Sequence, residues 1–256
     1  MSTNAPAENP RLRLSLLLWL AGMLGVVVIV VTVLPGLLGD LPLPAPIWVI
    51  SLASFAQSGL LLALAVWSGV ALASKVGLHA PAFEAAVTAR SIRSALRPQL
   101  IPGLVAGVLG GVGLFAIGAY ASPAALAEVQ QRFAVPIFAR VLYGGITEEL
   151  LLRWGLMTVL VWLAWRLVQG REGPPRAVYF WLAIVMSALL FGAGHLPAAA
   201  ILIGELTGEV VLFVVGANGA FGVLFGYLFW RFGLEAAMIA HVGAHAVSYV
   251  LSLGAA

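Results

Sequence analysis

Long apolar stretches separated by short polar connections dominate the chain. Seven of them predict membrane-spanning segments, at residues 14–38, 47–74, 100–120, 135–167, 179–194, 210–230 and 234–253. Several exceed the roughly 18 apolar residues with which a helix crosses a bilayer, and they lack the period-2 alternation of outer-membrane barrels. The pattern therefore predicts an all-α, polytopic membrane helix bundle. We expect about seven to eight transmembrane helices, because residues 198–208 could add one.

The polar connections divide the chain into three parts. We expect a disordered tail at residues 1–10 and N-terminal transmembrane helices at 11–130, with a basic cytoplasmic loop at 75–97. The core that carries the chemistry is expected at 131–256. Glycine is frequent in the third apolar region, which permits close helix contact. The fourth is longer than one span needs, and Gly144-Gly145 could divide it.

Composition excludes several classes of protein. The chain is 62% hydrophobic and 9% charged, which excludes an ordinary soluble domain. Zero cysteines exclude disulfides, thiol catalysis and cysteine-ligated metal, and nothing in the sequence indicates nucleic-acid binding.

The basic residues predict the orientation. With the N-terminus in the cytoplasm and seven crossings, only Arg132 falls on the far side, and Arg140 and Arg153 lie within the fourth region. The cytoplasmic side receives ten: Arg11, Arg13, Lys75, Arg90, Arg93, Arg97, Arg166, Arg171, Arg176 and Arg231. The positive-inside rule favours this arrangement, and we expect an integral protein of a bacterial inner membrane.

Three charged side chains interrupt the fourth region: Glu148, Glu149 and Arg153. An ionised side chain near the bilayer centre costs about 2.5–3.5 kcal/mol on insertion scales, so such residues usually face a protein interior and carry function. On a helix Glu149 and Arg153 are i and i+4 neighbours that can pair. Glu148 points about 100° away without a partner on its own helix, which suits a general base. A structural ion-pair cluster is the alternative.

Three of the four histidines lie in or at the ends of apolar regions. His195 ends the fifth, and His241 and His245 lie four apart on one face of the seventh. A glutamate can take the proton of a water that a histidine also holds, and further histidines can stabilise the oxyanion on an attacked carbonyl. These residue types favour hydrolysis by activated water over a structural role as buried core histidines.

Zinc binding is the competing chemical interpretation. His241-x-x-x-His245 has the spacing of helical zinc sites, and Glu148 with His195 could complete four ligands. The sequence contains no His-Glu-x-x-His, and the spacing alone is weak evidence. The residues therefore leave open a site without a cofactor and a zinc-dependent one.

Three motifs resemble those of the CPBP intramembrane endopeptidases, which group type II CAAX prenyl proteases with Abi bacteriocin-processing and self-immunity proteins. They are Glu148-Glu149-x-x-x-Arg153, Phe191-x-x-x-His195, and His241 with the residue four later. They occur in the family's order on three apolar segments, and the lead-in at 225–231 is also similar. The resemblance covers roughly residues 135–250 and favours the metal-free site.

The resemblance implies a role for each residue of these motifs. Glu148 and His195 would activate water, His241 and His245 would build the oxyanion site, and Glu149, Arg153 and Phe191 would support them. The chain departs from the family pattern in carrying His245 where asparagine is common, and Leu152 and Trp154 where an aromatic residue and a glycine often flank the arginine.

We therefore expect an intramembrane endopeptidase whose partners are the lipid bilayer and a peptide or membrane-protein substrate, with no nucleic acid. Prenylated substrates are implied only by the resemblance. A zinc-dependent version of the same protease, a non-enzymatic immunity or scaffold protein, and a proton-coupled transporter are the alternatives.

One length argument conflicts with this site. On straight helices Glu148 and His195 lie about 27 to 29 Å from Arg166 and Arg176, whereas His241 lies only about 15 Å from Arg231. Straight, upright helices would not bring the three side chains together.

Overall fold

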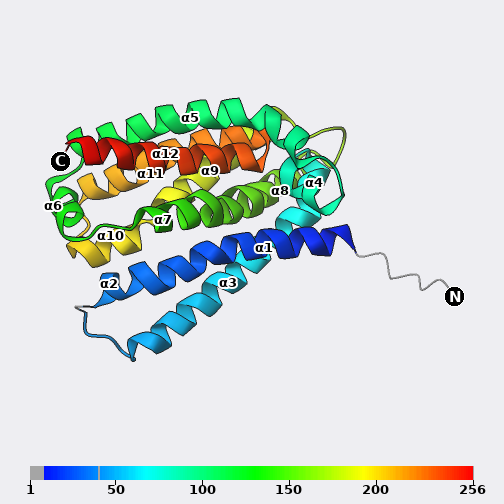
Figure 1. The fold of residues 1–256 in the computed structure, drawn as a ribbon. Helices are drawn as coiled ribbons and strands as arrows, with labels where there is room; N and C mark the ends of the chain where they lie inside the picture. Colours follow the sequence, from blue (N-terminus) through cyan, green and yellow to red (C-terminus); the bar gives the residue numbers. More distant parts are fainter. Residues whose placement is uncertain (1–8, 40, 256) are drawn as a thin grey trace.

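The computed structural model describes residues 9–39 and 41–255, and the regular elements in them are helices (Figure 1). They are α1 (Pro10–Val28), η1 (Ile29–Val33), α2 (Leu34–Leu38), α3 (Ile47–Leu72), η2 (Ala73–Val76), α4 (Pro81–Val87), α5 (Ile92–Tyr120), α6 (Ala124–Arg132), α7 (Ile137–Ala139), η3 (Arg140–Glu148), η4 (Leu150–Met157), α8 (Thr158–Leu167), α9 (Ala177–Gly194), α10 (Leu196–Ile203), α11 (Gly208–Phe232) and α12 (Leu234–Ala255). In the described residues they form seven candidate membrane spans. The predicted all-α, polytopic bundle is confirmed.

The structure gives more detail at three of the predicted boundaries. Residues 1–8 of the predicted tail lie outside the described residues, but Asn9 caps α1 by accepting a hydrogen bond from the backbone of Arg11. Helix α5 begins at Ile92, so the end of the predicted basic loop forms the first turns of a span. Helix α10 follows α9 directly after His195 and belongs to the same candidate span, Ala177–Ile203, rather than to an eighth.

The fourth region is one continuous helix, Ile137–Leu167, and Gly144-Gly145 do not divide it. Its segments η3 and η4 are π-helical, a form with i→i+5 hydrogen bonds that is often found at functional sites. This helix is central: η3 contacts α1 and α12, and η4 contacts α3 and α9. Figure 1 shows the α1–α3 hairpin on one side of it and α5 with α12 on the other.

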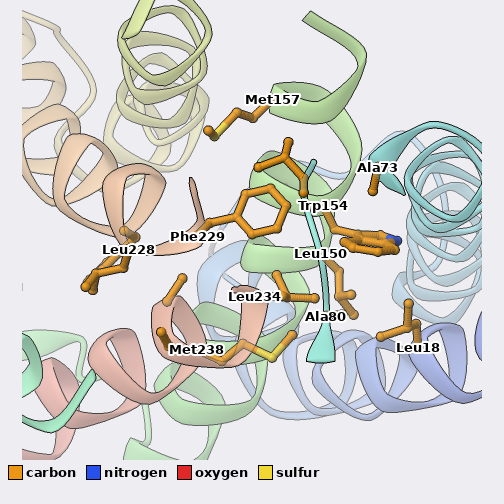
Figure 2. Packing of buried hydrophobic residues seen from close by; sticks show 14 of the residues in the cluster. Leu18, Ala73, Ala80, Leu150, Trp154, Met157, Leu228, Phe229, Leu234 and Met238 are labelled. Atoms are coloured by element: carbon orange, nitrogen blue, oxygen red, sulfur yellow. The ribbon is translucent and has the colours of Figure 1, made fainter. Parts of the chain in front are cut away.

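Apolar packing fixes the central helix in the bundle (Figure 2). Trp154 is 1% exposed and contacts Phe229 of α11, with 6.2 Å between the ring centroids. Leu150, one turn earlier, is buried in the same cluster as Leu18 of α1. Interiors packed at this density tolerate little rotation, so the cluster also sets the direction of Arg153, which lies between Leu150 and Trp154, and of the two glutamates just before Leu150.

Glycines let α5 and α12 approach closely, as the composition of the third apolar region predicted. A Cβ added at Gly107 would lie 3.1 Å from the Cα of Gly243, which is tighter than ordinary van der Waals contact. The opposite face of α5 exposes large apolar side chains, among them Leu104 and Leu109, as a lipid-facing surface requires.

The turn between α11 and α12 is buried, which the sequence did not indicate. Gly233 takes a left-handed φ of +115°, and the next residue, Leu234, is fully buried and donates its backbone N–H to the carbonyl of His79 (3.0 Å). The Glu235 carboxylate accepts two backbone N–H groups from α4, at 2.8 and 2.9 Å. Gln99 of α5 accepts another from the first turn of α12 (3.0 Å).

This buried turn removes most of the conflict in the length argument. Gln99 lies seven residues into α5, so α12 begins about 10 Å further inside the bundle than α5 does. His241 is moved inward by the same amount.

The segment that covers this turn carries a pH-dependent ion pair. Glu84 lies 3.5 Å from His79 and raises the pKa of that imidazole above 6.5. In turn, His79 lowers the pKa of Glu84 below 4.5. The charge of nearby Arg90 lowers both pKa values, so it opposes the shift of His79 and adds to that of Glu84. The raised histidine pKa stabilises the fold below pH 6.5 and loses its effect as pH rises through the folded value. The lowered glutamate pKa stabilises it above pH 4.5 and loses its effect as pH falls.

We expect Glu84→Gln to lower the thermal midpoint most between about pH 4.5 and 6.5, and by less above this window. Glutamine keeps the acceptor for the Ala80 N–H, so the change removes the charge and little else. Because the His79 side chain is half exposed, the effect should stay below about 1 kcal/mol. Thermal unfolding of both proteins across pH 4–9 measures it, and an equal difference at every pH would contradict the assignment.

Candidate active site

Glu148 lies between two imidazoles from different helices. Its Oε1 is 4.0 Å from Nε2 of His195, at the end of α9, and its Oε2 is 4.0 Å from Nε2 of His241 on α12. The Glu148 side chain is 15% exposed and that of His195 is 37% exposed, whereas His241 is buried. Three segments that are distant in the sequence thus converge on one partly accessible carboxylate.

The other ring nitrogen of each histidine is engaged elsewhere. Nδ1 of His195 lies 2.8 Å from the backbone carbonyl of Phe191, and Nδ1 of His241 lies 2.8 Å from Oε1 of Glu149. A carbonyl oxygen and a carboxylate can only accept, so each Nδ1 carries a proton and donates it. In a neutral ring this leaves the lone pair on Nε2, facing Glu148.

Glu149 and Arg153 form the pair predicted from their i, i+4 spacing. Nε of Arg153 lies 3.3 Å from Oε2 of Glu149, and both side chains are fully buried. Arg153 donates from Nη2 to the carbonyl of Gly222 (3.1 Å), and its guanidinium lies 5.0 Å from the ring centroid of Phe191. The arginine thus joins the central helix to α11 and α9, and Glu149 extends the connection to His241.

His245 extends the cluster along α12. Its ring stacks on that of His241, with 5.0 Å between centroids, and its buried Nδ1 has no hydrogen-bond partner among the described residues. Both histidines lie over Gly144: a Cβ built there would be 3.0 Å from Nε2 of His245 and 3.3 Å from Nε2 of His241. Gly144 therefore clears the space for these nitrogens.

The arrangement does not match a set of zinc ligands. Zinc requires three or four protein ligands at about 2.0–2.3 Å from one point. Among the described residues, no three histidine or acidic side chains are placed to hold a metal ion together. The zinc-dependent alternative with Glu148, His195, His241 and His245 as ligands stays a prediction, which metal analysis of the purified protein would test.

Comparison with known families identifies this part of the chain. Residues 130–247 match the family model described as type II CAAX prenyl endopeptidase Rce1-like. This segment is Rce1-like. The resemblance expected from the three motifs is confirmed, since the Rce1-like segment contains all of them. No curated protein and no solved structure matches the chain.

The family match and the spans together support a coarse assignment of this chain. An Rce1-like segment implies a protease, and the seven candidate spans of the described residues make the chain an integral membrane protein. The segment runs from the end of α6 into α12 and so contains the four predicted catalytic residues and their three supporting residues.

The Rce1-like segment also contains site residues that sequence reasoning missed. Phe225 stacks on His241, with 4.4 Å between ring centroids and 20° between planes. The Gly222 carbonyl accepts from Arg153, and no side-chain signal can reveal a backbone acceptor. Gly144 was considered only as a residue that could divide the helix, whereas its absent side chain makes room for two imidazoles.

We expect Gly144→Ala to lower proteolytic activity about ten-fold or more, because a misplaced catalytic group costs rate steeply. The added methyl forces His241 or His245 to shift by a few tenths of an ångström. Gly118→Ala on α5 is the matched control, since nothing lies within 4 Å of its added Cβ. Peptide cleavage and thermal unfolding are measured for both variants. Equal activity of the two would contradict a role for Gly144 in placing the imidazoles.

Proposed function

We propose that this protein is an intramembrane endopeptidase that hydrolyses a peptide bond with a water activated by Glu148 and His195. The observation that carries the proposal is the spacing of 4.0 Å between the Glu148 carboxylate and Nε2 of His195. This is too long for a direct hydrogen bond and suits one bridging water that contacts both groups. The free lone pair on Nε2 supports the same arrangement.

In the proposed reaction the bridging water attacks the carbonyl carbon of the scissile bond. Glu148 accepts one proton of the water as its oxygen bonds to that carbon, which gives a tetrahedral intermediate with negative charge on the former carbonyl oxygen. The intermediate collapses by breaking the C–N bond. The proton held by Glu148 passes to the leaving nitrogen, so the products are a carboxylic acid and an amine.

His241 and His245 are proposed to stabilise the oxyanion. A protonated Nε2 on His241 would donate to the negative oxygen, and Glu149, 2.8 Å from its Nδ1, would balance the positive charge on the ring. This is the part that a carboxylate plays beside a catalytic histidine in hydrolytic triads. His245 stacks on His241 and offers a second ring nitrogen over Gly144. Arg153 and Glu149 are positioning residues in this proposal.

The family description suggests the substrate class. A prenylated peptide that ends in a CAAX motif is the substrate we propose, because the matching family model is described as type II CAAX prenyl endopeptidase Rce1-like. For orientation, we propose a cytoplasmic N-terminus. The ten basic residues named above then share the cytoplasmic side of seven spans.

Cleavage by the purified, reconstituted protein tests the proposal. The protein in lipid vesicles is incubated with a farnesylated CAAX peptide and with its unmodified form, and mass spectrometry detects the products. We expect cleavage of the farnesylated peptide, undiminished by a metal chelator. Loss of cleavage with chelator and recovery with zinc would support the zinc-dependent alternative. If neither peptide is cleaved, the proposed substrate class is contradicted.

A further inference from the structure

A groove of about 680 Å³ lies on the basic end of the bundle, over the buried α11–α12 turn. It is outside the candidate active site. The ends of two candidate spans, α5 and α11, form its walls together with the segment that leads into α4. Its volume is in the range of pockets that hold small molecules.

The charge of this groove is positive. Its charged lining residues are Arg90, Arg231, His79 and Glu84, and the only carboxylate among them is paired with His79. Within the described part of the chain, no carboxylate lies within ion-pairing distance of Arg90 or Arg231. Both arginines are exposed, and Arg90 uses only its Nε, in a hydrogen bond to Thr88 (2.9 Å). Their terminal nitrogens are therefore available to an anion.

Aromatic side chains indicate that the groove lies at the level of lipid headgroups. Trp230, which lines the groove, packs edge-on against Trp181 (5.8 Å between centroids), and Trp181 also stacks on Tyr227 (5.9 Å). Tryptophan and tyrosine gather at the interface between the hydrocarbon and the headgroups. Phe232 adds a partly exposed apolar ring to the same groove.

We propose that this groove binds the headgroup of an anionic phospholipid, with Arg90 and Arg231 contacting its phosphate. Arginine is well suited to phosphate because its planar guanidinium offers two parallel donors. The apolar and aromatic residues beside the arginines would contact the start of the acyl chains. A free phosphate in solution offers the same charge but would gain nothing from these residues.

Occupancy of this groove would stabilise the fold. The lining includes Gly233 and Gln99, which position the first turn of α12, the helix of His241 and His245. A ligand that binds only the folded protein raises the free energy of unfolding by RT ln(1 + c/Kd), where c is the concentration of free ligand, and the unfolding temperature rises with it. The inference does not depend on proteolytic activity, so it can be tested even if the proposed function is wrong.

The experiment uses the full chain in detergent. Dioleoyl phosphatidylglycerol, dioleoyl phosphatidylcholine and inorganic phosphate are titrated separately, and both the thermal midpoint and the lipid bound in native mass spectrometry are recorded. We expect phosphatidylglycerol to raise the midpoint and to bind more tightly than phosphatidylcholine. Arg90→Gln and Arg231→Gln should each weaken phosphatidylglycerol binding about five-fold.

Two further variants decide whether the groove itself is responsible. Arg176→Gln removes the same charge from an exposed position outside the groove and should bind like wild type. Ser94→Glu places a negative charge in the groove and should weaken binding while keeping α5, because Ser91 with glutamate three residues later forms a capping box. The proposal is overturned if phosphatidylcholine or inorganic phosphate raises the thermal midpoint as much as phosphatidylglycerol does. It is also overturned if Arg176→Gln weakens phosphatidylglycerol binding as much as the groove variants do.

Discussion

Replacing Glu148 by glutamine is expected to lower kcat/KM for the peptide by about two orders of magnitude or more while leaving the fold intact. Glutamine has nearly the same shape but cannot take a proton from water, and a positioned general base contributes about 10²–10⁴-fold to rate. The carboxylate is 15% exposed and forms no direct hydrogen bond in the described structure. Its removal should therefore change the thermal midpoint little or raise it slightly, as is common at functional sites.

Glu172→Gln is the matched control for this variant. Glu172 lies in the exposed connection between α8 and α9, where loss of one carboxylate should affect neither activity nor stability. Activity is measured on reconstituted protein with the peptide substrate, and folding by thermal unfolding of the same preparations. Full activity of Glu148→Gln would remove this residue from the mechanism.

Arg153→Met is expected to have the largest effect on stability. The change leaves the fully buried Glu149 carboxylate without its arginine partner and with only its contact to His241, and breaking a buried ion pair from one side costs about 3–5 kcal/mol. Activity should also fall, because Glu149 contacts Nδ1 of His241 (2.8 Å) and would no longer be held by the arginine.

A double replacement separates charge burial from packing. Glu149→Gln combined with Arg153→Met removes both charges and should recover much of the lost stability, since replacing a whole buried pair is often near neutral. It should not recover activity, because His241 then lacks its carboxylate partner. Arg176→Met, at an exposed position, is the control for loss of an arginine. A double variant as unstable as Arg153→Met alone would contradict the electrostatic explanation.

The contrast between the two positions separates the possible functions of the protein. If the polar cluster only joined helices, the Glu148 variant would lose stability as the Arg153 variant does. If the protein were a proton-coupled transporter, purified wild type would not cleave peptide. A protease predicts cleavage by wild type, loss of activity without loss of stability at Glu148, and loss of both at Arg153.

The parts of the fold that depend on local pattern could be predicted from the sequence. The seven spans follow from apolar length, and the pairing of Glu149 with Arg153 follows from helical spacing. Helix α5 was predicted to start too late because Arg93 and Arg97 suggested a loop. Helices extend beyond the hydrocarbon, so basic residues can occupy the first turns of a spanning helix.

The parts of the site that depend on tertiary contacts could not be predicted. The inward position of α12 results from hydrogen bonds of its first turn to Gln99 and His79, more than 130 residues earlier in the chain. The contact between Glu149 and His241 joins residues 92 apart. No periodicity within one helix encodes such distances. The motifs singled out Glu148, His195 and His241, which the structure brings together, but they did not indicate the geometry of the contacts.

The central claim is that Glu148 and His195 act together on one water, and a double-mutant cycle tests it most directly. kcat/KM for the peptide is measured for wild type, Glu148→Gln, His195→Asn and the double variant. When two residues act as a unit, replacing either one removes most of their joint contribution, so the losses in kcat/KM of the two single variants do not add in free energy. We predict that kcat/KM of the double variant is about equal to that of the less active single variant. Losses that multiply across the two positions would contradict it.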